Sequence, residues 1–159
     1  MTKHVSLEIF DEHEEIIFYT LRISGQTHSE AEKFFLNHKN NEKYLEGVYI
    51  ILKKMDRMGE TGCEERHFRR EGKAKDRVCA LPEHLTATSV RLYAIRVSKN
   101  IVILGNGGLK TTATYNEDSY LNDCVEFLQT IDGIMKKRLL KDEILITKKV
   151  LSGNLNFEL

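Results

Sequence analysis

The segment that most constrains the fold is the run 101–104, in which every side chain is apolar. Such a short unbroken apolar run is typical of a central strand that is covered on both faces. The preceding segment 89–97 alternates, with Val90, Leu92 and Ala94 on one side, and a tight connection at 98–100 follows it. Residues 67–104 are therefore expected to form an antiparallel meander.

Helices are predicted before and after this meander along the chain. Ser29 and Glu32 have the spacing of a capping box, which indicates a short helix to about residue 39. Apolar residues recur at helical spacing over 42–58 and again up to about 140. The fold class we expect is α+β, with two N-terminal helices packed on a small antiparallel sheet, a long C-terminal helix and extra edge strands.

The length of 159 residues suits one domain with a proper core. We expect a single domain over 1–159, with extra strands at about 1–25 and a C-terminal extension at about 141–159. No charged-then-apolar leader is present at the start, and no apolar run approaches the ~20 residues of a membrane helix. These features predict a cytoplasmic protein with no membrane contact.

Charge is distributed unevenly although the net charge is zero. Residues 53–110 hold 13 lysines and arginines against 7 aspartates and glutamates, a net charge of +6, whereas 1–52 carry −4 and 111–159 carry −2. A basic zone between acidic flanks indicates an anionic partner, although a solvated basic face has the same appearance.

Metal and cofactor chemistry is not indicated. Cys63, Cys79 and Cys124 are odd in number and widely spaced, which fits neither zinc ligation nor a disulfide framework. The acidic residues lie mostly in the flanks, whereas a metal that cleaves phosphodiesters needs clustered carboxylates. We therefore expect no metal and no cofactor.

Cations are instead predicted to gather on the sheet. Strand neighbours in a meander would bring Arg70, Arg91 and Lys110 together on one face. Arg69 and Arg70 are successive residues of one strand and must point to opposite faces, so only one of them can join. Lys73 and Lys75 follow on a flexible polar linker and add to the same basic zone.

Such a group of cations can cleave RNA without a metal, because the 2′-hydroxyl attacks the adjacent phosphorus and arginine stabilises the developing charge. Lys110 or Lys73 would serve as acid or base if neighbouring cations depress its pKa, and His67 is the natural acid–base at neutral pH. Tyr93 would stack on a base or donate a hydrogen bond.

Backbone N–H groups of Gly107 and Gly108, in a run 105–108 expected to form a sharp break, would approach an anion closely. Each assignment has a structural alternative. Arg91 would then pair with a carboxylate of a helix, Tyr93 would be a core residue, and the glycines would only form a turn.

The segments 90–96 (VRLYAIR), 101–105 (IVILG) and 110–112 (KTT) resemble the RelE/ParE superfamily of bacterial toxins, especially its HigB-like, phage-derived branch. The upstream segment 67–70 (HFRR) is similar to an earlier basic strand of that family. The resemblance implies the compact toxin fold and metal-independent cleavage of mRNA, on the ribosome. It also implies neutralisation by a small helix-turn-helix antitoxin.

At the matching positions the resemblance implies that Arg70, Arg91 and Lys110 are the active-face cations, with His67 and Tyr93 assisting. The expected function is thus that of the toxin of a type II toxin-antitoxin system, acting as an endoribonuclease. Two alternatives stay open. The same scaffold would serve as a non-catalytic module that binds RNA or protein, or as a toxin of the gyrase-inhibiting branch, which binds protein.

Overall fold

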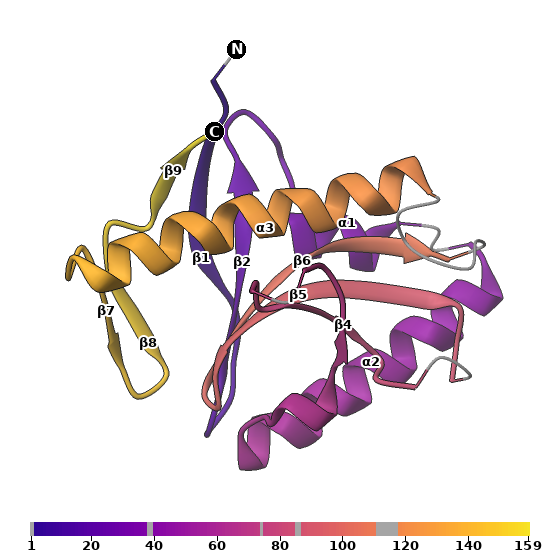
Figure 1. The fold of residues 1–159 in the computed structure, drawn as a ribbon. Coiled ribbons are helices and arrows are strands. Elements are labelled where there is room, and N and C mark those ends of the chain that lie inside the picture. The colour runs from indigo at the N-terminus through magenta and orange to yellow at the C-terminus, as the bar shows by residue number, and fades with distance from the viewer. Residues whose placement is uncertain (1, 38–39, 74, 85–86, 111–117) are drawn as a thin grey trace.

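The computed structural model describes residues 2–37, 40–73, 75–84, 87–110 and 118–159. Its elements follow one another along the chain in an order that begins with two strands and only then forms helices (Figure 1). The bounds are β1 His4–Glu12, β2 Ile17–Ile23, α1 Glu30–Leu36, α2 Glu42–Thr61, η1 Glu65–His67, β3 Arg69–Arg70, β4 Val78–Leu81, β5 Val90–Ser98, β6 Ile101–Leu109, α3 Ser119–Leu140, β7 Ile144–Thr147, β8 Val150–Gly153 and β9 Asn156–Glu158.

One mixed sheet dominates the molecule. Its seven strands follow the order β3-β4-β5-β6-β2-β1-β9, and β7 and β8 form a separate hairpin. The strand pairs are antiparallel except for β2 and β6, which run parallel over Ile17–Thr20 and Ile101–Leu104. The expected fold class is therefore wrong. The sheet is larger than predicted and is not purely antiparallel, and the strands expected as extras at about 1–25 are β1 and β2, which lie inside the main sheet, with β2 beside β6.

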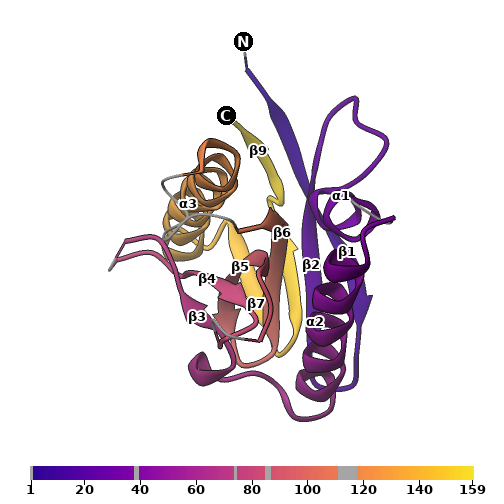
Figure 2. The same cartoon turned by 90° about the vertical axis from the view of Figure 1, so that its right-hand side faces the viewer.

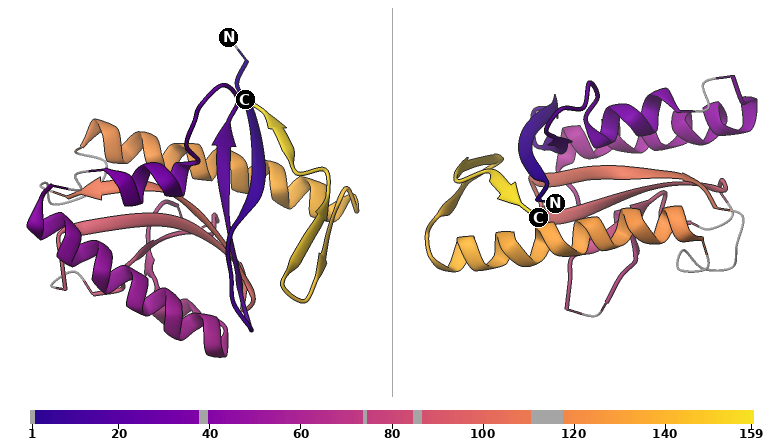
Figure 3. Two further views of the ribbon diagram at one scale, coloured as in Figure 1. Left: turned by 180° about the vertical axis from the view of Figure 1, so that it is seen from behind. Right: turned by 90° about the horizontal axis from the view of Figure 1, so that it is seen from above.

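Helices cover both faces of this sheet. Seen from above, α1 and α2 lie on one side of the strands and α3 lies on the other (Figure 3), and the end-on view in Figure 2 shows the same three layers. Each side has its own apolar core. Ile101 and Ile103 belong to the core under α3, whereas Val102 and Leu104 belong to the core under α1 and α2. All four side chains are fully buried, so the prediction of a central strand is confirmed.

Local signals correctly predicted the starts of the first two helices and the meander. The Ser29 hydroxyl accepts from the Glu32 backbone N–H, and the Glu32 carboxylate accepts from the Ser29 N–H in return. Strands β3 to β6 pair in chain order, as the meander required. β1 and β2 form a hairpin with an irregularity between Ile9 and Asp11.

Two local predictions fail. His67 ends the short 3-10 helix η1, and the strand after it has only the two residues Arg69 and Arg70. Gly105–Gly108 was expected to be a sharp break, but these residues continue β6 up to Leu109. The glycines are there because the neighbours are close: a Cβ on Gly107 would collide with the Arg91 backbone carbonyl, and one on Gly105 would meet Leu128.

The segment 141–159 adds β7, β8 and the edge strand β9, which pairs with β1. The two ends of the chain meet there, because the N–H of Lys3 donates to the carbonyl of Leu159 and the reverse bond also forms, each at 2.8 Å. Among the described residues no helix has the length and apolar character needed to cross a membrane.

Candidate functional site

The short edge strand β3 sends its two arginines to opposite sides of the sheet. Arg69 pairs with Ala80, whose side chain is in the core under α3, and Arg70 pairs with Cys79, which belongs to the core under α1 and α2. Arg69 therefore lies on the α3 face. The same alternation puts Arg91 on that face, because Val90 and Leu92 on either side of it belong to the opposite core.

Glu71 follows β3 and lies beside Arg69. The Arg69 Nε atom is 3.2 Å from Glu71 Oε1, and only 8% of Glu71 is exposed. Burial raises the pKa of the Glu71 carboxyl, and the charges of Arg69, Lys110 and Arg91 oppose that rise in part. This carboxylate thus sits among three cations that come from different strands, and it holds a proton more readily than an ordinary glutamate.

Arg91 lies beneath this surface. It is 3% exposed, and its Nη1 atom donates to the carbonyls of Thr88 and Val90, the latter at 2.9 Å. Burial and the nearby charge of Arg69 lower the pKa of its guanidinium, while Tyr93 and Glu71 raise it. The group remains cationic because the reference pKa of arginine lies so far above neutrality. Arg91 therefore contributes positive charge from inside the protein, and its buried guanidinium is not presented at the surface to bind a phosphate directly.

Tyr93 is fully buried in the core under α3. Burial, and next the charge of Glu71, raise the pKa of its phenol. A ring with no exposed face offers no surface on which a base can stack, so the expected stacking role has no support. Tyr93 therefore contributes a neutral hydroxyl in the neighbourhood of the Glu71 charge.

Lys110 completes the group at the end of β6. Its backbone N–H donates to the Ser89 carbonyl at 2.7 Å, which ties the end of β6 to the chain just before β5. The positive charge of Lys110 also lowers the pKa of Glu71, against the effect of burial. Thr111 and Thr112, which carry part of the family resemblance, lie outside the described residues. We call Arg69, Glu71, Arg91, Tyr93 and Lys110 the Glu71 cluster.

The structure does not bring the remaining predicted residues into this cluster. Arg70 is on the opposite face, where its Nη2 atom donates to the carbonyls of Lys73 and Asp76. His67 accepts a 2.8 Å hydrogen bond at Nδ1 from the Glu64 backbone. Gly107 and Gly108 are strand residues whose backbone supports the sheet.

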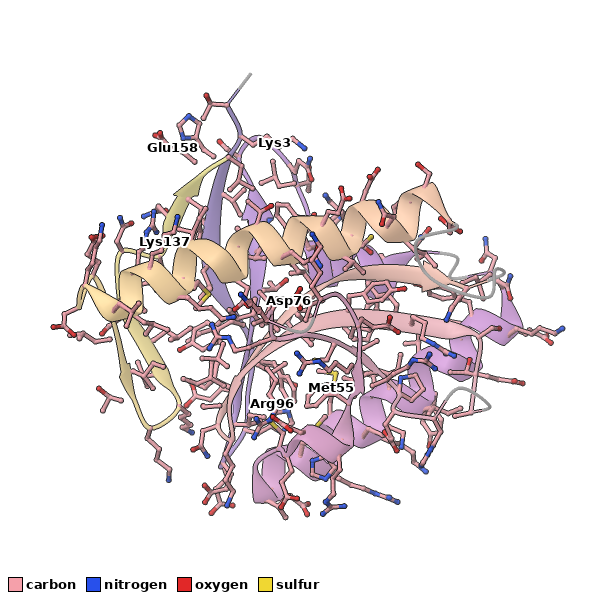
Figure 4. All side chains as sticks on the ribbon, viewed as in Figure 1. Lys3, Met55, Asp76, Arg96, Lys137 and Glu158 are labelled. Atoms are coloured by element: carbon pink, nitrogen blue, oxygen red, sulfur yellow. The ribbon has the colours of Figure 1, made fainter. Side chains whose placement is uncertain are left out.

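Lys73 and Lys75 line a surface hollow beside α3. Asp76, labelled in Figure 4 just below that helix, organises the hollow: its Oδ2 atom accepts from the Lys73 N–H at 2.8 Å and from Gln129 at 2.9 Å. The Lys75 carbonyl accepts from Lys136. These lysines thus belong to the contact between the β3–β4 connection and α3, not to the Glu71 cluster.

Glu71 is the residue that sequence reasoning missed. Within a basic segment a single carboxylate looks like a charge-balancing residue, and only its burial gives it a perturbed pKa. The available signal was its spacing, because Glu71 is two residues after Arg69 and so continues the same face of an extended chain.

Among the described residues no group of three or more histidines, cysteines, aspartates or glutamates is placed to hold a metal ion. Comparison of the chain with known proteins finds no matching family model, no similar curated protein and no similar solved structure. The Glu71 cluster and the sequence resemblance are therefore the two features that point to a function.

Proposed function

We propose that this chain is an endoribonuclease that cleaves RNA through the Glu71 cluster without a metal. The observation that carries the proposal is the 3.2 Å contact of Arg69 with Glu71, a buried carboxylate of raised pKa that also lies within the influence of Arg91 and Lys110. A general base is most effective when its pKa lies near the working pH, and burial moves Glu71 in that direction.

In the proposed step, the Glu71 carboxylate takes the proton of the RNA 2′-hydroxyl. The 2′-oxygen attacks the adjacent phosphorus, and the bond from phosphorus to the 5′-oxygen breaks. Lys110 gives a proton to the leaving 5′-oxygen. The products are a 2′,3′-cyclic phosphate and a 5′-hydroxyl, with Arg69 and the buried Arg91 stabilising the extra negative charge of the transition state.

The resemblance to RelE/ParE toxins extends this proposal to a biological role. The chain would be the toxin of a type II pair, would cut mRNA on the ribosome and would be held inactive by a small helix-turn-helix antitoxin. Expression of the chain alone should then arrest growth, and Glu71→Gln should relieve that arrest. Growth arrest that persists in the variant would contradict this role for the cluster.

The direct test uses purified protein, end-labelled RNA, free or on ribosomes, and a chelator. Wild-type protein should leave fragments that end in 2′,3′-cyclic phosphate. Glu71→Gln should slow cleavage by ~10²–10⁴-fold, as expected for loss of a general base. Arg69→Gln should also slow it strongly, whereas Arg57→Gln, at an exposed arginine of α2 outside the cluster, should not.

A second candidate function is a binding module that does not cleave. The deep burial of Arg91 and Tyr93 favours it, because these side chains cannot contact RNA directly in this conformation. RNA would then bind with an affinity that falls on Arg69→Gln, and no cyclic phosphate would form under any condition.

A further inference from the structure

A cavity of about 420 Å³ opens beside the edge strand β3, and none of its lining residues belongs to the Glu71 cluster. Four of its lining residues are arginines and one is Glu65, and apolar side chains complete the wall. The lining includes Arg66, Arg70, Arg77, Arg96, Phe68 and Val97. Arg96, labelled in Figure 4 near the lower ends of the strands, belongs to β5, and its Nη2 atom donates to the carbonyl of Cys63, just after α2, at 3.1 Å.

Positive charge in this cavity is only partly balanced. Arg77 binds the buried Asp132, with Nη2 2.7 Å from Oδ1, and Arg66 binds Glu64 at 2.7 Å. Arg96 differs, because no ion pair joins it to a carboxylate within the described residues. Its Nε atom is buried and makes no hydrogen bond within the described part of the chain. A buried donor without an acceptor is costly, so this nitrogen is suited to an added anion.

We propose that this cavity binds a nucleotide, with its phosphate on Arg96 and Arg70 and its base against Phe68 and Val97. Guanidinium groups match phosphate oxygens in a bidentate manner and remain charged. The apolar wall favours a ligand with a planar, weakly polar part over a bare inorganic anion. The volume lies within the range of small-ligand sites, ~300–1,000 Å³.

This proposal goes beyond the proposed cleavage and does not depend on it. Arg69 and Arg70 are successive residues that point to opposite faces, so no side chain of the cavity belongs to the Glu71 cluster. The nucleotide could reach the cavity free or as part of an RNA strand. Both present the same phosphate and base.

Isothermal titration of the full chain with adenosine 5′-monophosphate tests the proposal. Binding should weaken at least tenfold in Arg96→Gln and less in Arg96→Lys, which keeps the charge but loses the fork. Arg57→Gln, an exposed arginine of α2 outside the cavity, should leave affinity unchanged. Absence of binding at millimolar nucleotide, or equal affinity of wild type and Arg96→Gln, would overturn the proposal.

Two further arms use wild-type protein, in case Arg96→Gln does not fold. Hydrogen exchange should slow in β4 and β5 when the nucleotide is added, and protection elsewhere alone would count against the cavity. A 5′-phosphorylated trinucleotide that binds wild type more tightly than the mononucleotide, with the same protection of β4 and β5, identifies RNA as the source; equal or weaker binding identifies free nucleotide. Glu71→Gln should keep its affinity, so loss of cleavage and loss of binding are separable.

Discussion

At the scale of single residues, the chemistry of the candidate site depends on where a side chain is buried. Arg69, Arg91 and Lys110 were identifiable from the sequence as cations near a sheet. Glu71 was not, because the property that matters, a raised pKa, arises from burial and not from residue type. Alternation along a strand correctly predicted that the side chains of Arg69 and Arg70 lie on opposite faces of the sheet, but it could not indicate which of them shares a face with Arg91.

Burial of Glu71 predicts that stability depends on pH in a definite direction. Its pKa in the folded chain is above the unfolded value of 4.5. As pH rises from the unfolded pKa to the folded pKa, the unfolded chain loses this proton first, so the free energy of unfolding falls. Glu71→Gln has no such proton to lose. It should unfold at a higher temperature than wild type at about pH 7.5, with the difference absent at about pH 3.5.

Thermal unfolding followed by circular dichroism at the two pH values measures this difference. Glu64→Gln is the matched control, because the hydrogen bond and charge of Arg66 lower the pKa of the exposed Glu64 carboxyl. That variant should gain no stability at neutral pH. A Glu71→Gln variant that is less stable than wild type at neutral pH would show that its contact with Arg69 outweighs its burial.

At the scale of elements, helix α3 is fastened to strand β4 by one buried carboxylate. The fully buried Asp132 accepts from the Arg77 backbone N–H at 2.9 Å and from its Nε atom at 2.8 Å, and Lys136 lies 3.3 Å away. The hydrophobic repeat of α3 predicted the helix. It gave no indication that Asp132, a polar residue on the buried side of that helix, would bind Arg77.

Asp132→Asn should destabilise the chain strongly, because it leaves the Arg77 guanidinium without its buried countercharge. Removal of one partner of such a pair typically costs about 3–5 kcal/mol. Urea unfolding measures the change. Asp123→Asn, at an exposed position of the same helix, should alter stability by less than about 0.5 kcal/mol. Equal effects of the two substitutions would contradict the role given to Asp132.

The glycines of β6 illustrate why an element is hard to predict from a composition cue. Their run suggested a turn, yet the sheet uses Gly107 where the backbone of β5 passes too close for a side chain. Gly107→Ala should therefore cost about 1–3 kcal/mol, the usual range for overpacking. Gly108→Ala should be tolerated, since its Cβ would meet Tyr120 at an ordinary 3.5 Å. The urea midpoints of the two variants measure this. A lower midpoint for Gly107→Ala alone indicates a steric clash at that position, whereas equal losses in both variants would contradict it.

At the scale of the whole molecule, sequence patterns identified most strands and the helices but not how the strands associate. Local pairs such as β5 with β6 follow from short connections. The parallel pairing of β2 with β6 does not, because it joins residues that are far apart in the chain and carries no local signal. This pairing turns the expected small antiparallel sheet into a seven-stranded mixed one.

The last strand, β9, is part of the main sheet, and the sequence could not indicate that it pairs with β1. Phe157 of β9 is 1% exposed, and the Arg138 guanidinium lies 4.7 Å from its ring centroid. Phe157→Ala should cost about 3–5 kcal/mol, as for other buried aromatic residues. Glu158→Ala, at the exposed position next to it, should be near neutral. Differential scanning calorimetry of both variants makes the comparison, and equal melting temperatures would contradict a structural role for β9.

The parallel pairing of β2 with β6 also has a kinetic consequence. One half of the sheet contains β3 to β6 and the other contains β1, β2 and β9. Within each half the strands are joined by short connections and can pair locally, except that β9 returns from the C-terminus to β1. The seam between the halves matches Ile17 with Ile101, and it is closed by the Thr20 hydroxyl, which donates to the Leu104 carbonyl at 2.9 Å. Closing so large a loop is slow, so this seam should form late during refolding, and its loss should separate the molecule into two half-sheets.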